Sequence, residues 1–202
     1  MLTKKASLSL FLLLTLFLGG CGKPQIKSIG PNSTILAFGD SLTSGFGVRT
    51  NESYPYLLEE LIGCEVINSG ISGEDTKAGL ERLAGELQKH TPDLVVLCFG
   101  GNDMLRKQPT AQTISNLRKM IHSIQESGAD IILLGVPKPS LILSVPDFYE
   151  KLADEHKIPY EGDILKKVLS SASLKSDQIH PNEKGYKLIA ESVYQLIKDS
   201  EL

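Results

Sequence analysis

"DLVVLCF" (residues 93–99) is, after its first residue, an unbroken run of apolar side chains about as long as one β-strand. Four further apolar runs of strand length flank it along the chain, at residues 34–38, 65–68, 130–136 and 158–160. Strands that are apolar on both sides are typical of a parallel sheet whose two faces are both covered by helices. The chain is therefore expected to build one central parallel sheet of five strands.

The segments between these runs have the apolar spacing of amphipathic helices. In residues 76–90, for example, Leu80, Leu83, Ala84 and Leu87 recur at the i, i+3, i+4 spacing. The predicted helices cover residues 53–62, 76–90, 110–127, 146–157, 162–170 and 182–198. Strands that alternate with helices predict the α/β class, here a flavodoxin-like three-layer α/β/α sandwich.

The composition indicates one globular domain. The chain has 202 residues, of which 41% are hydrophobic and 22% charged, and a net charge of −3. A basic surface for nucleic acid is therefore not expected, and neither a phosphate-binding loop, a dinucleotide fingerprint nor zinc-ligand spacing occurs. We predict no metal, no cofactor and a monomer. Cys64 and Cys98 fall on separate apolar segments, so we expect free thiols rather than a disulfide.

The first 21 residues have the pattern of a secretory signal peptide: two lysines, a largely apolar run from Leu8 to Leu18, two glycines and Cys21. The apolar run is too short for a membrane-spanning helix. Its ending, "LGGC", resembles a bacterial lipobox, in which the cysteine becomes the lipidated N-terminus. The alternative is ordinary signal cleavage with Cys21 incidental.

The lipobox resemblance implies an extracytoplasmic lipoprotein that is held to a membrane by acyl chains on Cys21. The protein would lie on the periplasmic side of that membrane. Gly22 after the cysteine favours the outer membrane if the host has one. Residues 22–32 are polar and contain glycine and proline, which predicts a flexible tether. Residues 33–202 would then form the globular domain.

Small and polar residues follow the predicted strands where they end. Ser41 comes two residues after Gly39 at the end of the first strand, "NSGISGED" (68–75) follows the second and "GGND" (100–103) the third. "SDQIHPNEKGY" (176–186) precedes the last helix. Because ligand sites in open parallel sheets form beyond the carboxyl ends of the strands, we expect these segments to meet in one site.

These segments hold the groups that acyl transfer needs: a hydroxyl nucleophile, an imidazole base, a carboxylate that orients it, and donors for an oxyanion. The candidates are Ser41 as nucleophile, His180 as base and Asp177 as the orienting acid. The backbone N–H groups of Ser41 and Gly73 and the side-chain amide of Asn102 are the candidate oxyanion donors. Each residue alone has a plainer interpretation, such as a helix cap, a turn glycine or a surface histidine. Their occurrence together, in this order, favours the catalytic one.

Three further acidic residues near these segments are expected to have structural roles. Asp40 would brace the turn that carries the serine, because Asp177 already lies next to the histidine in sequence. Asp75 and Asp103 would cap helices or loops.

The blocks "FGDSLTSG", "ISGE", "GGND" and "DQIHP", in this order, resemble the four signature blocks of the GDSL or SGNH hydrolases. The resemblance extends over residues 33–202 and is strongest to the bacterial acyl-thioesterase, lysophospholipase and arylesterase subgroup. It implies the SGNH hydrolase fold and places the nucleophile on Ser41, the acid and base on Asp177 and His180, and the remaining oxyanion groups on Gly73 and Asn102.

The predicted activity is serine-dependent hydrolysis of acyl esters, thioesters or lysophospholipids through an acyl-enzyme. Because acyl-CoA is cytosolic and the chain carries an export signal, lysophospholipids or other small acyl esters are the favoured substrates. Residues 135–146 are apolar and loop-like. Either they line an acyl-chain groove, or Leu141 and Ile142 are core residues under a loop, and the sequence leaves both open.

Two other classes of function remain open. A carbohydrate O-acetylesterase acting on envelope glycans would use the same residues, but it would favour an aromatic cleft, and the chain has no tryptophan. A non-catalytic, envelope-binding lipoprotein would have no need of all five catalytic-type residues.

Overall fold

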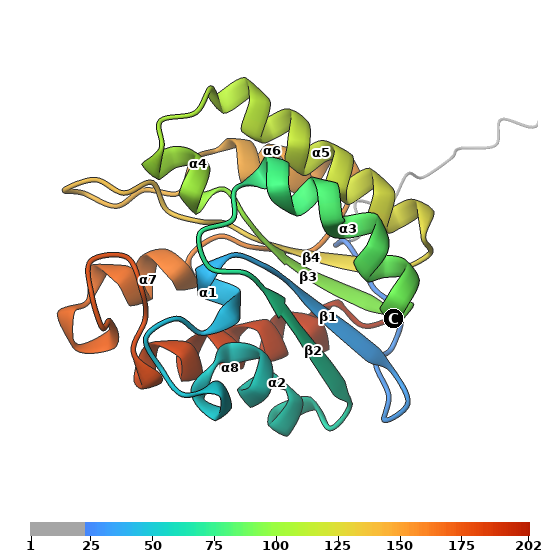
Figure 1. Ribbon diagram of the computed structural model, residues 1–202. Helices are drawn as coiled ribbons and strands as arrows, with labels where there is room; N and C mark the ends of the chain where they lie inside the picture. The colour runs from blue at the N-terminus through green and yellow to red at the C-terminus, as the bar shows by residue number, and fades with distance from the viewer. Residues whose placement is uncertain (1–22) are drawn as a thin grey trace, which may run out of the picture.

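The computed structural model describes residues 23–202, which form a parallel β-sheet between two layers of helices (Figure 1). The strands are β1 (Thr34–Gly39), β2 (Glu65–Gly70), β3 (Leu94–Cys98), β4 (Asp130–Leu134) and β5 (Tyr160–Glu161). They pair in the order β2-β1-β3-β4-β5, with every pair parallel. This is the flavodoxin-like strand order, so the predicted fold class is confirmed. The predicted signal peptide and Cys21 lie outside the described residues.

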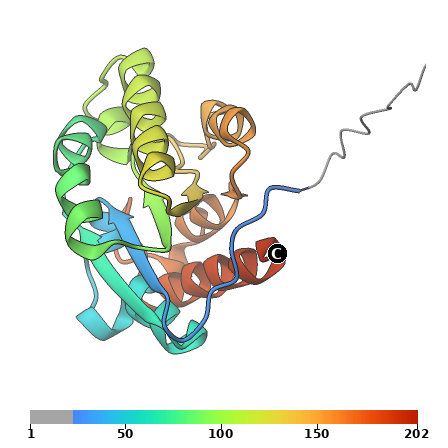
Figure 2. The ribbon, with the colours of Figure 1, turned by 90° about the vertical axis from the view of Figure 1, so that its right-hand side faces the viewer.

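The long helices divide between the two faces of the sheet (Figures 1 and 2). Helices α2 (Tyr54–Ile62) and α8 (Glu183–Ser200) pack together on one face, and α7 (Ile164–Ser170) packs on α8. Helices α3 (Thr76–His90), α5 (Thr110–Glu126) and α6 (Phe148–His156) cover the other face. None of the helices in residues 23–202 has the length and apolar character needed to cross a membrane.

The core lies where both layers meet the central strands. Every residue of β3 and the apolar residues of β1 have no exposed surface, as expected for strands covered on both faces. Cys64 and Cys98 are buried and free, in agreement with the prediction.

The predicted helices and strands differ from the observed ones by no more than two residues at either end. Two short helices were not predicted, α1 (Ser41–Ser44) and α4 (Gly101–Leu105), nor were the 3₁₀ turns Thr50–Glu52 and Ala172–Leu174. Helices of four or five residues are too short to show an apolar period. Both α1 and α4 begin just beyond the carboxyl end of a strand, β1 and β3 respectively.

The prediction of a flexible tether over residues 22–32 is wrong for the part that the structure describes. Ile26 and Ile29 are buried in the core. The backbone N–H of Ile26 donates to the carbonyl of Ser200 over 2.8 Å, and its own carbonyl accepts from Leu202 over 3.1 Å. The segment is polar on average, but its two isoleucines, spaced three apart, both face the core. The domain therefore includes residues as early as Ile26.

We expect Ile26→Ala to lower the free energy of unfolding by about 2–4 kcal/mol, because it removes a buried side chain and leaves a cavity. Urea unfolding would measure the loss. Gln25→Ala, at the exposed neighbouring residue, should change stability by less than about 0.5 kcal/mol. Equal stability of the two variants would show that the segment is not part of the folded domain.

Candidate active site

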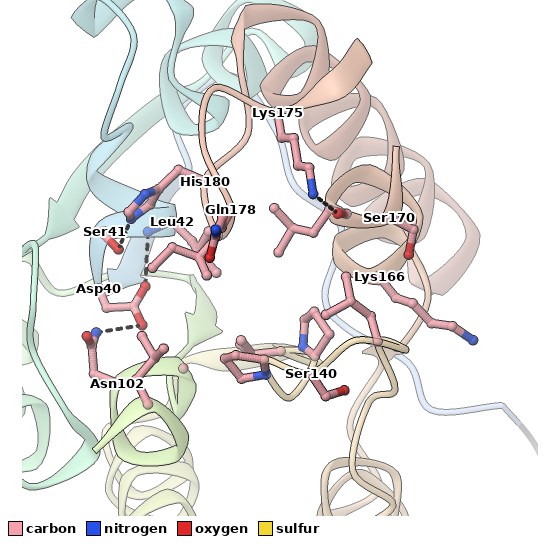
Figure 3. A pocket seen from close by; sticks show the side chains of 18 of the residues that line it. Asp40, Ser41, Leu42, Asn102, Ser140, Lys166, Ser170, Lys175, Gln178 and His180 are labelled. Carbon is pink, nitrogen blue, oxygen red and sulfur yellow. Dashed lines mark hydrogen bonds between the residues drawn. The ribbon is translucent and has the colours of Figure 1, made fainter. Parts of the chain in front are cut away.

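Ser41 lies at the junction of β1 and α1, where the chain leaves the sheet. Asp40 caps α1, because its Oδ1 accepts a hydrogen bond from the backbone N–H of Leu42 over 3.0 Å. The Tyr186 hydroxyl, from α8, donates to the carbonyl of Ser41 from 3.4 Å. Asp40 is thus the brace that the sequence predicted, and the turn presents the serine to a cavity (Figure 3).

His180 and Asp177 form a hydrogen-bonded chain with Ser41. Figure 3 shows the part of this chain between His180 and Ser41. Nε2 of His180 lies 3.0 Å from Oγ of Ser41, and Nδ1 lies 2.7 Å from Oδ2 of Asp177. When Nδ1 carries the proton that Asp177 accepts, Nε2 is left with a lone pair facing the serine hydroxyl. This is the arrangement that activates a serine nucleophile.

Asp177 is fixed by its own loop. Its Oδ1 accepts backbone N–H bonds from Ile179 and His180, each over 2.8 Å. Partial burial raises the pKa of Asp177, but the hydrogen bonds from the His180 ring and from these two N–H groups outweigh it and hold the pKa below its usual range. The carboxylate therefore stays charged opposite the imidazole.

Phe46 packs on the face of the His180 imidazole, a contact that the sequence analysis missed. Its ring centroid lies 4.4 Å from that of His180, with 37° between the ring planes. The Tyr186 hydroxyl donates to the carbonyl of Phe46 over 3.2 Å and thereby ties this loop to α8. The His180 ring is thus held along its edge by Asp177 and on its face by Phe46.

Asn102, from α4, brings its side-chain amide to the cavity beside Ser41 (Figure 3). Its Nδ2 donates to the carbonyl of Glu74 over 2.8 Å and to Oδ2 of Asp40 over 3.3 Å. Gly73, next to Glu74, has a φ of +83°, which favours glycine, but it is not among the residues that line the cavity. The structure thus places Ser41, Asp177, His180 and Asn102 together, and it links Gly73 to them through its neighbour Glu74.

Arg82 on α3 organises the loop that carries Gly73, and the sequence analysis did not identify it. Its guanidinium donates to both carboxylate oxygens of Glu74, over 2.9 and 2.8 Å, and to the carbonyl and hydroxyl of Ser69. It also stacks 4.1 Å above the ring of Phe38 in β1. Arg82 therefore ties the ends of β1 and β2 to the loop whose carbonyl holds Asn102.

The two other acidic residues near the site have the structural roles predicted for them. Asp75 caps α3 and accepts from the backbone N–H of Ala78 over 3.0 Å. Asp103 is fully buried and accepts from the backbone N–H of Thr76 over 2.9 Å and from the Thr113 hydroxyl over 3.3 Å. These bonds join α4 to the start of α3 and to α5.

Asp40 is almost completely buried, and this burial, aided by the nearby Asp103 carboxylate, raises its pKa to about 7 although the N–H of Leu42 and the amide of Asn102 lower it. Between about pH 4 and pH 7 the folded protein therefore holds a proton on Asp40 that the unfolded chain has lost. This group then makes the free energy of unfolding fall as the pH rises through that window, by on the order of 4 kcal/mol.

We expect Asp40→Asn, which cannot ionise, to flatten this part of the pH dependence. Urea unfolding at pH 5 and pH 8 would show a smaller decline in the variant than in the wild type. Asp199→Asn, at an exposed carboxylate near the end of α8, is the matched control and should keep the wild-type decline. An Asp40→Asn variant with the same decline as wild type would contradict the raised pKa.

A cavity of about 880 Å³ extends from Ser41 toward the loop of residues 136–146 (Figure 3). Beyond the polar end that holds Ser41, Asn102 and His180, its lining includes the apolar side chains of Leu105, Val136, Leu143, Leu169 and Ile179. Its volume falls within the range of ligand sites. Leu141 and Ile142 lie at its rim and are exposed, so the interpretation of these two residues as buried core is wrong.

We compared the sequence with models of known protein families. Residues 37–188 match the model of the GDSL-like Lipase/Acylhydrolase family. The chain belongs to this family. Membership confirms the resemblance seen in the signature blocks and, with the relatives below, the prediction that the protein is an ester hydrolase.

Several members of the family resemble the chain over most of its length. An arylesterase of Vibrio mimicus is 35% identical over 172 residues, which cover 80% of this chain and 86% of that protein. The protein of Escherichia coli K12 named thioesterase 1/protease 1/lysophospholipase L1 is 31% identical over 166 residues, 78% of this chain and 80% of that protein.

Solved structures show the same fold. The esterase EstA from Pseudoalteromonas sp., in a structure inhibited by monoethylphosphonate, has a TM-score of 0.73 and 26% identity, with 83% of this chain and 98% of EstA covered. The structure of TesA has a TM-score of 0.74 and 30% identity, with 82% of this chain and 98% of TesA covered. Because the match spans 98% of both solved chains, we expect residues 23–202 to fold without residues 1–22.

Proposed function

We propose that this protein hydrolyses acyl esters, thioesters or lysophospholipids through an acyl-enzyme on Ser41. The observation that carries the proposal is the chain of hydrogen bonds from Ser41 through His180 to Asp177, with lengths of 3.0 and 2.7 Å, at one end of a largely apolar cavity. The polar end suits an ester carbonyl, and the apolar part suits an acyl chain.

In the proposed mechanism, Nε2 of His180 takes the proton of Ser41 as Oγ attacks the carbonyl carbon of the substrate. The resulting tetrahedral oxyanion collapses, and the leaving alcohol or thiol departs with the proton from His180. Water then attacks the acyl-enzyme, with His180 again taking the proton. The acid is released and Ser41 recovers its hydroxyl hydrogen, so each turnover consumes one water.

The proposed oxyanion donors are the backbone N–H groups of Ser41 and Gly73 and the side-chain amide of Asn102. Two bonds support the assignment of Asn102. The bond to Glu74 fixes the amide, whereas the 3.3 Å contact to Asp40 is long for a hydrogen bond and is easily exchanged for an oxyanion. The assignment of Gly73 rests on the family resemblance and on its position next to Glu74.

We expect Asn102→Ala to lower kcat by about 10²–10³-fold with little change in KM, because an oxyanion donor binds the transition state more strongly than the substrate. Steady-state kinetics on a nitrophenyl ester would measure both constants. Asn51→Ala, in the exposed 3₁₀ turn before α2, is the control. A raised KM with unchanged kcat would make Asn102 a substrate-binding residue instead.

A substrate panel tests the proposed function. It comprises nitrophenyl esters of increasing acyl length, an acyl thioester, lysophosphatidylcholine and acetylated xylan. Hydrolysis of the acyl substrates with little release of acetate from xylan is the expected result. Activity confined to acetylated xylan would favour a carbohydrate O-acetylesterase, and no activity on any substrate would favour a non-catalytic binding protein.

We also propose that the mature protein is a lipoprotein that begins at Cys21, on the extracytoplasmic side of a membrane. The "LGGC" ending of the signal supports this proposal. Because Ile26 is buried, only residues 22–25 would separate the lipidated cysteine from the folded domain. Mass spectrometry of the native N-terminus tests the proposal: acyl chains on Cys21 are expected, and an unmodified N-terminus at any other residue would overturn it.

A further inference from the structure

The loop of residues 136–146 forms a finger that projects beyond the helices at the carboxyl edge of the sheet (Figure 1, gold, at the left). Its two arms are tied together, because the backbone N–H of Lys138 donates to the carbonyl of Ser144 over 2.9 Å. Near its end, the Ser140 hydroxyl donates to the carbonyl of Ile142. The finger is therefore a structured projection whose end carries Leu141 and Ile142, here named the apolar tip.

The apolar tip is unusual in its exposure. Leu141 is 103% exposed and Ile142 83%, the highest values among the large apolar side chains of residues 23–202. Single exposed apolar residues are common on protein surfaces. Two adjacent ones, at the end of a tied projection and at the rim of the cavity that holds Ser41, indicate a surface that is covered in use.

The charges around the cavity indicate what covers the tip. Lys166 lines the cavity and is exposed, and Lys138 lies exposed on the finger itself. Lys175 also lines the cavity, but its Nζ donates to the carbonyl of Leu169 over 3.1 Å. The only carboxylate among the lining residues is that of Asp40, which is buried.

The whole chain has a net charge of −3, but the exposed charged side chains that line this cavity or stand on the finger are lysines. Acidic groups lie close by as well: Asp177 is hydrogen-bonded to His180, and Glu150 and Asp163 line a second hollow together with Lys166. An apolar projection flanked by lysines complements a layer of anionic headgroups over hydrocarbon.

We propose that the apolar tip inserts into the surface of an anionic phospholipid bilayer and thereby holds the cavity mouth against it. Leu141 and Ile142 enter the boundary between headgroups and acyl chains, and Lys138 and Lys166 contact lipid phosphates. The proposal goes beyond the hydrolytic function, because it concerns binding to a surface and requires no turnover.

Docking by the tip is also a contact separate from the proposed anchor on Cys21. The described N-terminal segment pairs with the end of α8, at the amino edge of the sheet. The finger projects from the opposite edge (Figure 1). The test therefore uses residues 23–202, from which the cysteine and the signal are absent.

The chain has no tryptophan, so a single introduced tryptophan reports on its own surroundings. Leu141→Trp places the probe at the tip, and Leu61→Trp, 44% exposed on α2, is the matched control. With vesicles of phosphatidylcholine and phosphatidylglycerol, the emission of the tip probe is expected to shift to the blue and that of the control to stay unchanged. Vesicles of phosphatidylcholine alone should produce a much smaller shift.

Sedimentation with the same vesicles measures binding without a probe. The double variant Leu141→Ser/Ile142→Ser is expected to bind the anionic vesicles roughly tenfold or more weakly than wild type, because it removes two apolar side chains from the contact. Leu61→Ser should bind as wild type does. Circular dichroism would check that every variant keeps the fold.

Several results would overturn the proposal. These are unchanged vesicle binding by the double variant, equal shifts of both probes, or equal binding to neutral and anionic vesicles. A blue shift of the tip probe that appears with rising protein concentration and no vesicles would mean that a second copy covers the tip. A shift produced by a soluble ester analogue alone would mean that the finger closes over substrate instead.

Discussion

Ser41→Ala is expected to lower the hydrolysis of nitrophenyl esters by about 10³-fold or more, while the protein keeps its fold. The change removes the oxygen that attacks the carbonyl. That oxygen is the hydroxyl to which Nε2 of His180 is hydrogen-bonded. Because Ser41 faces the cavity rather than the core, the loss of its hydroxyl leaves packing intact.

The residual rate of Ser41→Ala should stay above the rate without enzyme, since the oxyanion donors and the cavity remain. Ser28→Ala is the matched control, because it makes the same chemical change at an exposed residue at the opposite edge of the sheet. Full activity in Ser41→Ala, with the fold intact by circular dichroism, would end the nucleophile assignment.

His180→Ala is expected to be comparably damaging, because Ser41 loses the base that accepts its proton and the leaving group loses its acid. Steady-state kinetics on a nitrophenyl ester would measure the loss.

His122→Ala is the control for the histidine, because that side chain is 66% exposed on α5. It should keep the wild-type rate. An unchanged rate in His180→Ala would mean that another group acts as the base.

The sheet could be predicted from the sequence because strands that are buried on both faces consist almost entirely of apolar residues. Residues 94–98 are apolar without interruption, and the structure covers both faces of β3. The convergence of the candidate site residues was predictable for a related reason. Parallel strands bring their carboxyl ends to one edge, so residues that follow separate strands in sequence, such as Ser41 and Asn102, meet in space.

The features that the sequence analysis missed depend on contacts between distant segments. In the sequence, Arg82 has the position of an ordinary polar residue on the outer side of a helix. In the structure, its guanidinium donates to backbone carbonyls at the ends of β1 and β2. Phe46 reads as a loop residue, yet it stacks on an imidazole 134 positions later in the chain. No local period reports such contacts, because the partner is set by the fold and not by the neighbouring residues.

The N-terminal segment is the opposite case, because its polar composition does not reflect how it packs. Lysines, a proline and a glycine around Ile26 predicted a solvated tether. Two isoleucines and the backbone bonds to the C-terminal end of α8 are enough to pack the segment onto the domain.

Covalent trapping of the nucleophile tests the central claim most directly. The protein would be incubated with a nitrophenyl ethyl phosphonate, digested, and its peptides analysed by mass spectrometry while the remaining activity is followed. The account predicts one phosphonyl group per chain, on the peptide that contains Ser41, with activity lost in proportion and no label in Ser41→Ala. Hydrolysis that continues with Ser41 fully modified, or a label on another residue that accounts for the lost activity, would contradict it.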